Sequence, residues 1–361
     1  MCVCQGLLKL RPLLRSTRSP SISDIVNNNN RSVATWLLVC CALVFAMVVL
    51  GGVTRLTGSG LSMVDWRPVT GVLPPLGDNE WQQVFEMYQQ TPEFQKENSH
   101  MDVSDFKGIF WLEYLHRLLG RTIGIVFLAP FLFFVWKGYI QKREFPKYTL
   151  MFVLGGMQGV LGWYMVKSGL IDNPNVSQYR LAAHLLAAFL IYAYMFWVAL
   201  TLLLPSREPQ RHPWYGKTLA LTALLTMTIM SGAFVAGLKA GKIYNTFPKM
   251  GGYWIPPDFL ALEPAWRNFF DNMAAVQFEH RVLAITTFVL IVAYWIRLRK
   301  ANLPDRIRRG VNALLHTAVL QVGLGIATLL LVVPIFLAAS HQAVAMLLFT
   351  VALYLCHGLR N

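Results

Sequence analysis

The chain has 361 residues, of which 55% are hydrophobic and only 14% are charged, whereas a soluble globular protein has about 25% charged residues. This composition excludes an ordinary soluble domain, and several apolar stretches reach the length of about 20 residues that a helix needs to cross a bilayer. The net charge of +14 does not indicate a nucleic-acid partner, because the basic residues lie in short clusters between the apolar stretches. The sequence therefore predicts an all-α membrane protein.

Residues 1–30 have the composition of a mitochondrial transit peptide. They contain several basic residues and serines, and no acidic residue precedes Asp24. The leucines of this segment can form an apolar face opposite the basic one, and they are too interrupted for a secretory signal. An ordinary disordered basic tail is the alternative interpretation.

Eight apolar spans follow, and each is predicted to be a transmembrane helix. They cover approximately residues 33–53, 109–137, 148–167, 180–204, 217–238, 276–297, 311–333 and 337–357. Basic residues are concentrated in three connections that alternate with the others, so the positive-inside rule places these connections and both termini in the matrix. The two long loops, at about 54–108 and 239–275, would then face the intermembrane space.

The second half of the chain repeats the first. The sequence GVTR at 52–55, after the first span, resembles GAFV at 232–235, after the fifth, and a glycine and a proline pair follow each. QGVLG in the third span likewise resembles QVGLG in the seventh. Because each repeat has an even number of spans, the copies share one orientation and are related by an axis along the membrane normal. The sequence predicts eight transmembrane helices arranged as two pseudo-symmetric four-helix bundles, at residues 31–204 and 217–361.

Four of the eight histidines occupy equivalent places in the two halves, near the intermembrane-space ends of the even-numbered spans. They are His116, His184, His280 and His341. Ionisable residues at membrane depth are costly and usually functional, and a neutral imidazole is a good ligand for iron. One histidine pair per bundle suits the two axial positions of a haem iron, whereas zinc would need three or four ligands. The alternative is that each histidine only bonds a neighbouring helix.

Arginines accompany these histidines. They are Arg117, Arg121, Arg180 and Arg281. We expect them to bind haem propionates, because a guanidinium matches a carboxylate bidentately. Snorkelling to the outer headgroups is the alternative.

Glu113 is the candidate for catalysis. It precedes His116 by three residues, so the two share a helix face. In the second half the nearest acid, Glu279, directly precedes His280 and points about 100° away from it. The repeats therefore differ where chemistry could occur, so that one haem could react while the other serves as a cofactor. The alternative is that Glu113 simply pairs with Arg117 one turn later.

These motifs resemble the haem A synthase family, in its mitochondrial branch. The resemblance covers about residues 35–355 and depends on five segments. They are GGVTRLTGSGLSMVDWRPVTGVLPPL (51–76), EYLHRLLGR (113–121), RLAAH (180–184), GAFVAGLKAGKIYNTFPKMGGYWIP (232–256) and FEHR (278–281). The resemblance implies an enzyme of the mitochondrial inner membrane that oxidises the C8 methyl group of haem o to a formyl group by successive hydroxylation. The product, haem A, would supply cytochrome c oxidase.

The resemblance also implies roles for individual residues. His280 and His341 would hold a resident haem b, His116 and His184 would face the substrate haem o, and Glu113 would be the essential acid. Electrons would come from a ferredoxin-type donor on the matrix side. Haem o synthase is a possible source of substrate, membrane lipids surround the chain, and a homo-oligomer is possible.

Two other functions also fit the four histidines. A di-haem b-type cytochrome that only transfers electrons predicts two stable haem b groups and gives Glu113 no special role. A carrier that hands haem onward without chemistry predicts one loosely held haem with unchanged side groups.

Overall fold

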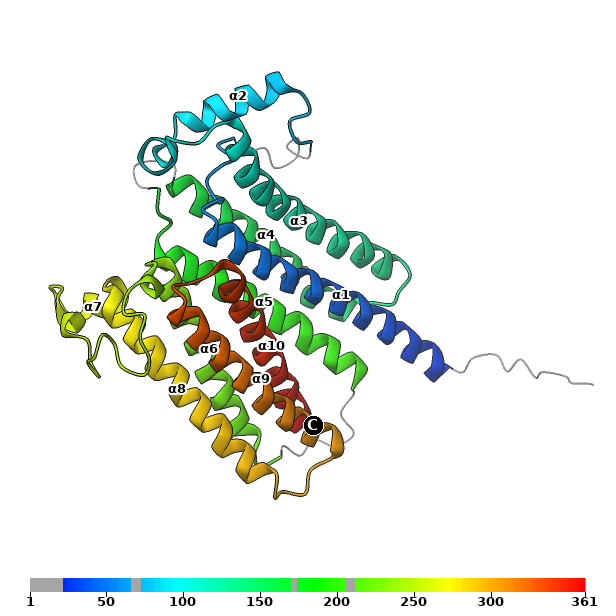
Figure 1. Ribbon diagram of the computed structural model, residues 1–361. Helices are drawn as coiled ribbons and strands as arrows, with labels where there is room; N and C mark the ends of the chain where they lie inside the picture. The colour runs from blue at the N-terminus through cyan, green and yellow to red at the C-terminus, as the bar shows by residue number, and fades with distance from the viewer. Residues whose placement is uncertain (1–21, 66–72, 170–173, 205–211, 361) are drawn as a thin grey trace, which may run out of the picture.

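Figure 1 shows the computed structural model, which describes residues 22–65, 73–169, 174–204 and 212–360. Residues 1–21 of the transit peptide predicted at 1–30 lie outside the described residues, and residues 22–30 form the start of the first helix, so the transit peptide stays a prediction. The α-helices are α1 (Ile22–Leu56), α2 (Asp78–Gln89), α3 (Val103–Trp136), α4 (Phe145–Gly169), α5 (Gln178–Leu203), α6 (Tyr215–Gly237), α7 (Asn268–Asp271), α8 (Met273–Leu298), α9 (Asp305–Leu330) and α10 (Ile335–Arg360). Short helical turns occur at Phe94–Asn98, Lys142–Glu144, Ala240–Lys242, Pro257–Leu260 and Ala265–Arg267.

Within the described part of the chain, eight helices are long and apolar enough to cross a membrane. They are α1, α3, α4, α5, α6, α8, α9 and α10, and each overlaps one predicted span. Their outward faces are apolar; Met157 and Val160 of α4, for example, are each 62% exposed. A surface of this kind is suited to lipid and not to water. The eight predicted spans are confirmed, and the chain is a multi-pass membrane protein.

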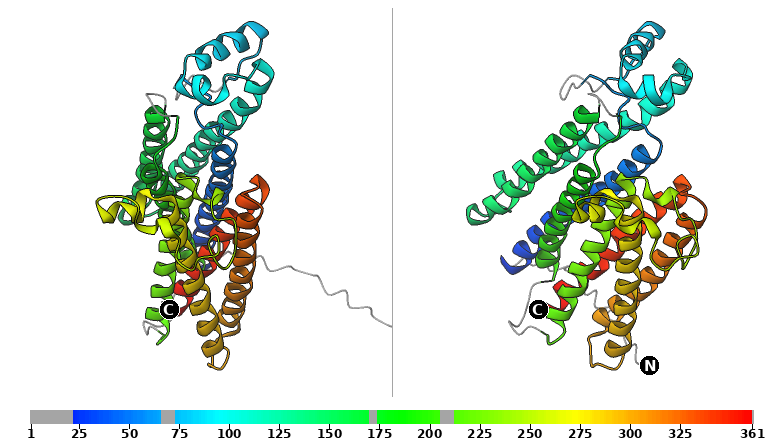
Figure 2. Two further views of the ribbon diagram at one scale, coloured as in Figure 1. Left: turned by 60° about the vertical axis from the view of Figure 1, so that its left-hand side comes forward. Right: turned by 90° about the vertical axis from the view of Figure 1, so that its left-hand side faces the viewer.

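The eight long helices pack in two sets of four (Figures 1 and 2). In the first set α1 and α4 each contact both α3 and α5. In the second set α8 and α10 each contact both α6 and α9. The sets meet where α1 and α5 contact α10 and where α5 contacts α6. At this junction the rings of Phe189 and Phe349 are 5.3 Å apart. These contacts favour the arrangement as two pseudo-symmetric bundles at 31–204 and 217–361, which stays a prediction.

The connection between α1 and α3 forms a small structure of its own at one end of the molecule (Figure 2). Here α3 begins at Val103, six residues before the predicted start of its span, and Asp102 caps it by accepting a hydrogen bond from the Asp105 amide at 2.9 Å. The additional turns of α3 pack against α2 through a mainly aromatic cluster. Its buried members are Trp81, Phe85, Tyr88, Phe106, Ile109, Phe110 and Tyr114.

The connection between α6 and α8 ends at Asn272, which sets the start of α8. The Asn272 side chain accepts hydrogen bonds from the amides of Ala274 and Ala275 at 2.8 and 3.3 Å, as an N-cap residue does. His280 therefore lies roughly two turns inside α8. His184 of α5 and His341 of α10 lie at similar depths in their helices, whereas His116 lies deeper in α3, which begins earlier.

Candidate functional site

The structure brings the four histidines together as two pairs, one in each set of helices. His116 of α3 is close enough to His184 of α5 to interact with it electrostatically, and His280 of α8 interacts in the same way with His341 of α10. All four side chains are half-buried. The two members of each pair come from different helices of one half, as the ligands of a group bound inside a helical bundle do.

Each histidine ring lies against a glycine of the preceding span. The four contacts are Gly51–His116, Gly162–His184, Gly232–His280 and Gly325–His341. A Cβ atom added at any of these glycines would lie between 2.8 and 3.3 Å from the nearest ring atom, which is closer than ordinary van der Waals contact. A larger residue at any of these positions would therefore displace an imidazole.

These contacts correct the register of the predicted repeat. Gly232 corresponds to Gly51, because each contacts the first histidine of its half. The predicted repeat aligned Gly232 with Gly52 instead, and this alignment was wrong by one residue. The corrected register also aligns Gly60 with Gly241 without a gap.

Buried polar atoms at both pairs have no hydrogen-bond partner among the described residues. They are Nδ1 of His184, Oε1 of Gln158, Nδ1 of His341 and Oε1 of Gln321. The two glutamines do contact the histidines: Gln158 donates to the His184 carbonyl at 2.6 Å, and Nε2 of Gln321 is 3.4 Å from Nε2 of His341. Because buried polar groups normally have partners, the free ring nitrogens of His184 and His341 fit residues that ligate a bound group, and the glycines give the imidazoles room to lie in place.

Ser231 orients the ring of His280. Its hydroxyl donates to the Thr228 carbonyl at 2.8 Å and also lies 2.8 Å from Nδ1 of His280. When Nδ1 carries the ring proton, the Ser231 oxygen can accept it, and Nε2 keeps its lone pair for a metal. The corresponding position in the first half is Leu50, which offers no hydroxyl group.

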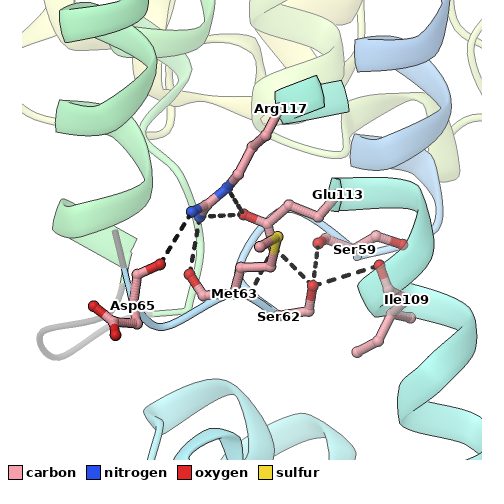
Figure 3. Close-up of polar contacts among 7 residues, drawn as sticks. All are labelled: Ser59, Ser62, Met63, Asp65, Ile109, Glu113 and Arg117. Atoms are coloured by element: carbon pink, nitrogen blue, oxygen red, sulfur yellow. Dashed lines mark hydrogen bonds and ion pairs between the residues drawn. The ribbon is translucent and has the colours of Figure 1, made fainter. Parts of the chain in front are cut away.

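Glu113 is 3% exposed, and both of its carboxylate oxygens are bound (Figure 3). Oε2 accepts hydrogen bonds from the Ser62 hydroxyl at 2.7 Å and the Met63 amide at 2.8 Å. Oε1 accepts from Nη2 and Nε of Arg117 at 2.6 and 3.1 Å. The ion pair that formed the alternative interpretation of Glu113 is therefore present. In this arrangement the carboxylate ties the segment after α1 to α3.

Gln277 is the counterpart of Glu113, and sequence comparison missed it by considering only the acid Glu279. Gln277 precedes His280 by three residues and is 2% exposed. Its Nε2 donates to the carbonyls of Ala240 and Ile243 at 2.8 and 2.6 Å, so it ties the segment after α6 to α8. The shared spacing in EYLHR and QFEHR was the signal that could have found it.

The arginines after the two histidines make the same contacts in both halves. Each donates to two equivalent main-chain carbonyls of the adjacent outer segment at 2.7–3.4 Å, and Arg281 also donates to the Pro248 carbonyl at 3.5 Å. The acceptors are Met63 and Asp65 for Arg117, and the equivalent residues Tyr244 and Thr246 for Arg281. Both guanidinium groups thus hold outer segments in place, and their role as propionate ligands stays a prediction.

The remaining predicted residues lie on the same helices. The guanidinium of Arg180 lies over the ring of Tyr164 at 4.8 Å from its centre, a cation–π contact that joins α5 to α4. Arg121 is half-buried, one turn after Arg117 in α3. Glu279 has a buried carboxylate oxygen without a hydrogen-bond partner in the part of the chain that the structure describes.

Glu93, between α2 and α3, is a second buried acid of the first half. It is 5% exposed and accepts a hydrogen bond from the Tyr88 hydroxyl at 3.1 Å. Burial raises the pKa of the Glu93 carboxyl to about 7, against the lowering effect of the Tyr88 hydrogen bond, and the negative charges of Glu113 and Glu97 add to the rise. This carboxyl can therefore exchange a proton near neutral pH.

Comparison with known proteins identifies relatives over nearly the whole chain. The family model COX15-CtaA, described as cytochrome oxidase assembly protein, matches residues 34–353. A relative named "Heme A synthase" from Nitrosospira multiformis is 54% identical over 92% of this chain and 94% of its own length. Relatives named "Heme A synthase COX15" from Homo sapiens and Arabidopsis thaliana are each 46% identical, over 92% and 91% of this chain and 83% and 75% of their own lengths. This chain belongs to the COX15-CtaA family of cytochrome oxidase assembly proteins, and its eukaryotic relatives fit the mitochondrial branch.

Proposed function

We propose that this chain is a haem A synthase, an oxidoreductase that converts the C8 methyl group of haem o to a formyl group and so supplies haem A for cytochrome c oxidase. The observation that carries the proposal is the presence of two histidine pairs, each histidine seated against a glycine, in a chain 54% identical to a protein named for this activity. When bound, haem would supply the redox chemistry, and the protein would orient the ring and manage protons.

The two halves are assigned different haems. We assign a resident haem b to His280 and His341, in the half at 217–361, because the Ser231 hydroxyl lies 2.8 Å from Nδ1 of His280, where it can orient the ring for ligation. We assign the substrate haem o to His116 and His184, in the half at 31–204. This first half contains the buried acids Glu113 and Glu93, which the oxidation of a methyl group could use as proton acceptors.

Glu113 is the acid–base group of the proposal. Arg117 fixes Oε1, whereas Oε2 accepts from the hydroxyl of Ser62, a group that can itself pass a proton. Glu113 is also only one helical turn from His116. The carboxylate would therefore hold or release a proton at Oε2 without losing its orientation.

The setting of the protein is part of the proposal. We place the chain in the mitochondrial inner membrane with both termini in the matrix, because basic residues gather in the connections on that side, for example Lys142 and Arg143. A ferredoxin-type protein would donate electrons there, and haem o synthase would supply the substrate. Association into a homo-oligomer is an additional proposal.

A di-haem b-type cytochrome that only transfers electrons is the second candidate. One specific observation favours it: every contact of Glu113 has an evident structural purpose, because the carboxylate joins α3 to the segment after α1. In this function Glu113 would need no role in proton transfer.

Extraction of haems from cells that make the full chain and are supplied with haem o distinguishes the two functions. Wild type would be compared with Glu113→Gln, His280→Ala and the exposed control Glu97→Gln, using mass spectrometry. Haem A or its hydroxylated precursor in wild type and Glu97→Gln, and neither in Glu113→Gln, supports the synthase. Unmodified haem o and haem b in every sample, with a working electron donor, would instead support the cytochrome.

A further inference from the structure

One polar contact crosses between the halves next to both histidine pairs. Gln342 directly follows His341 in α10, and its Nε2 donates to the carbonyl of Val48 in α1 at 2.7 Å. The two helices lie side by side at the junction of the two sets (Figure 1). A side-chain amide that bonds the main chain of another helix fixes the two helices in rotation and in translation, because the hydrogen bond is directional.

Gly52 provides the space for the Gln342 amide. A Cβ atom at position 52 would overlap the amide oxygen of Gln342 and lie 2.9 Å from its Cδ. The next residue towards Val48, Gly51, is the glycine that lies against His116. Two adjacent glycines of α1 therefore contact the two halves: Gly51 lies against His116, and Gly52 lies against Gln342, which follows His341.

The equivalent junction between α5 and α6 is apolar. Leu185 follows His184 where Gln342 follows His341, and it packs against the hydrophobic core. Ala233 follows Gly232 where Gly52 follows Gly51, and it is 3% exposed. The repeat thus has apolar residues at these two positions in one junction, so the amide and the glycine at the other junction need a separate reason.

We propose that Gln342 is a positioning residue, which through Gly52 and Val48 holds the ligand His341 in a fixed relation to the ligand His116. A disturbance of the contact on the α1 side then changes the ligand geometry of the haem in the second half. This inference rests on the proposed function, because it requires that His280 and His341 hold a haem. Val48 is 5% exposed and Gln342 is half-buried, so water competes little for this hydrogen bond.

The test uses the full chain carrying His184→Ala, so that haem b is bound by His280 and His341 while α1, α3 and α10 keep their contacts. Into this parent we would introduce Gly52→Ala, which intrudes on the amide from the first half, and Gln342→Met, which keeps the volume and removes the donor. Gly124→Ala in α3 is the control, because a Cβ there meets no atom within 4 Å. The measurements are the haem content, the electron paramagnetic resonance g values of the ferric haem, its midpoint potential and the apparent melting temperature.

We expect Gly52→Ala and Gln342→Met to shift the g values and the midpoint potential in the same direction at unchanged haem content, with Gly124→Ala identical to the parent. Unchanged g values and potential in both variants, with only a lower melting temperature, would show simple packing and overturn the inference. A parent without any haem would overturn the assignment of His280 and His341 first, and this inference with it.

Discussion

The two outer segments are fastened to the helices by different chemistry. After α1, carboxylates accept hydrogen bonds: Glu113 binds the segment at Ser62 and Met63. After α6, amides donate them: Gln277 binds main-chain carbonyls, and Asn268 and Asn272 do the same nearby. Glu113 and Gln277 occupy equivalent helix positions, and each is followed by an equivalent arginine. The two fastenings therefore differ mainly in that the first uses an ionisable group and the second a neutral one.

Because of this difference, the contacts that hold the outer segment depend on pH in the first half and not in the second. An amide makes the same hydrogen bonds at any pH, whereas a carboxylate loses its ion pair when it is protonated. The second half, fastened by Gln277, is therefore suited to hold a permanent cofactor. The first half has the ionisable groups Glu93 and Glu113 in its outer segment and at the start of the adjoining helix, which suits the half that we propose for the reaction.

The largest expected effect concerns the histidines themselves. His280→Ala removes a proposed axial ligand, and we expect the affinity for haem b to fall by more than about 100-fold, since even outer-shell partners of a metal contribute roughly 10–100-fold. The purified protein would lose most of its Soret absorbance. Retention of full haem b content in His280→Ala would contradict the assignment of the resident haem to the second half.

Exchanging the acid and the amide tests the comparison directly. Glu113→Gln removes one partner of the buried Glu113–Arg117 ion pair, for which we expect about 3–5 kcal/mol of destabilisation, together with a loss of haem A formation by about 10²–10⁴-fold if the acid acts in proton transfer. Thermal unfolding in detergent and extracted haem A are the measurements.

The reciprocal change, Gln277→Glu, provides the matched comparison. It places a carboxylate against the carbonyls of Ala240 and Ile243, where the amide now donates, so we expect lower stability and no gain in haem A formation. If Glu113→Gln lost stability but kept full haem A formation, the acid would be structural, and the halves would not differ in the way proposed.

A smaller effect is expected at the glycines beside the histidines. Gly325→Ala adds a methyl group 2.8 Å from Cε1 of His341, and an overpacked interior position typically costs about 1–3 kcal/mol. Gly323→Ala in the same helix is the control, because nothing lies within 4 Å of a Cβ there. Weaker haem b retention in Gly325→Ala alone would support the seating of His341, and equal retention in both variants would argue against it.

The spans and the histidines could be predicted from the sequence because both follow from patterns along the chain. A hydrophobic stretch of membrane length identifies its helix without any tertiary information, and the parity of the spans places all four histidines at one side. Glu113, His116 and Arg117 were recognised for the same reason, since their spacing puts them on neighbouring helical turns.

What sequence reasoning missed depends on contacts between helices. The seating of His116 against Gly51 required the relative rotation of α1 and α3, which no local pattern determines, and the repeat was therefore aligned one residue out of register. Gln277 was overlooked because the search was for an acid, although the geometry requires only a side chain that can bind the outer segment and Arg281.

The smallest effect is the pH response of the first outer segment, and it shows whether the acid–amide difference matters outside the histidine pairs. Burial raises the pKa of Glu93 to about 7 from a reference value of 4.5, so the folded state binds a proton that the unfolded chain releases between these values. Stability is therefore lost as pH rises from about 4.5 through 7, by at most about 3 kcal/mol above this range.

Glu93→Gln removes that loss, so its melting temperature should exceed that of wild type at pH 8 and match it more closely at pH 5. The exposed Glu86→Gln, seven residues earlier, is the control, because Glu86 is not among the charges that raise the pKa of Glu93. A Glu93→Gln variant with the same advantage at both pH values would show that improved packing and not ionisation is responsible. In that case the carboxylates of the first outer segment would differ from the amides of the second only in shape, and the proton-dependent role of the first half would depend on Glu113 alone.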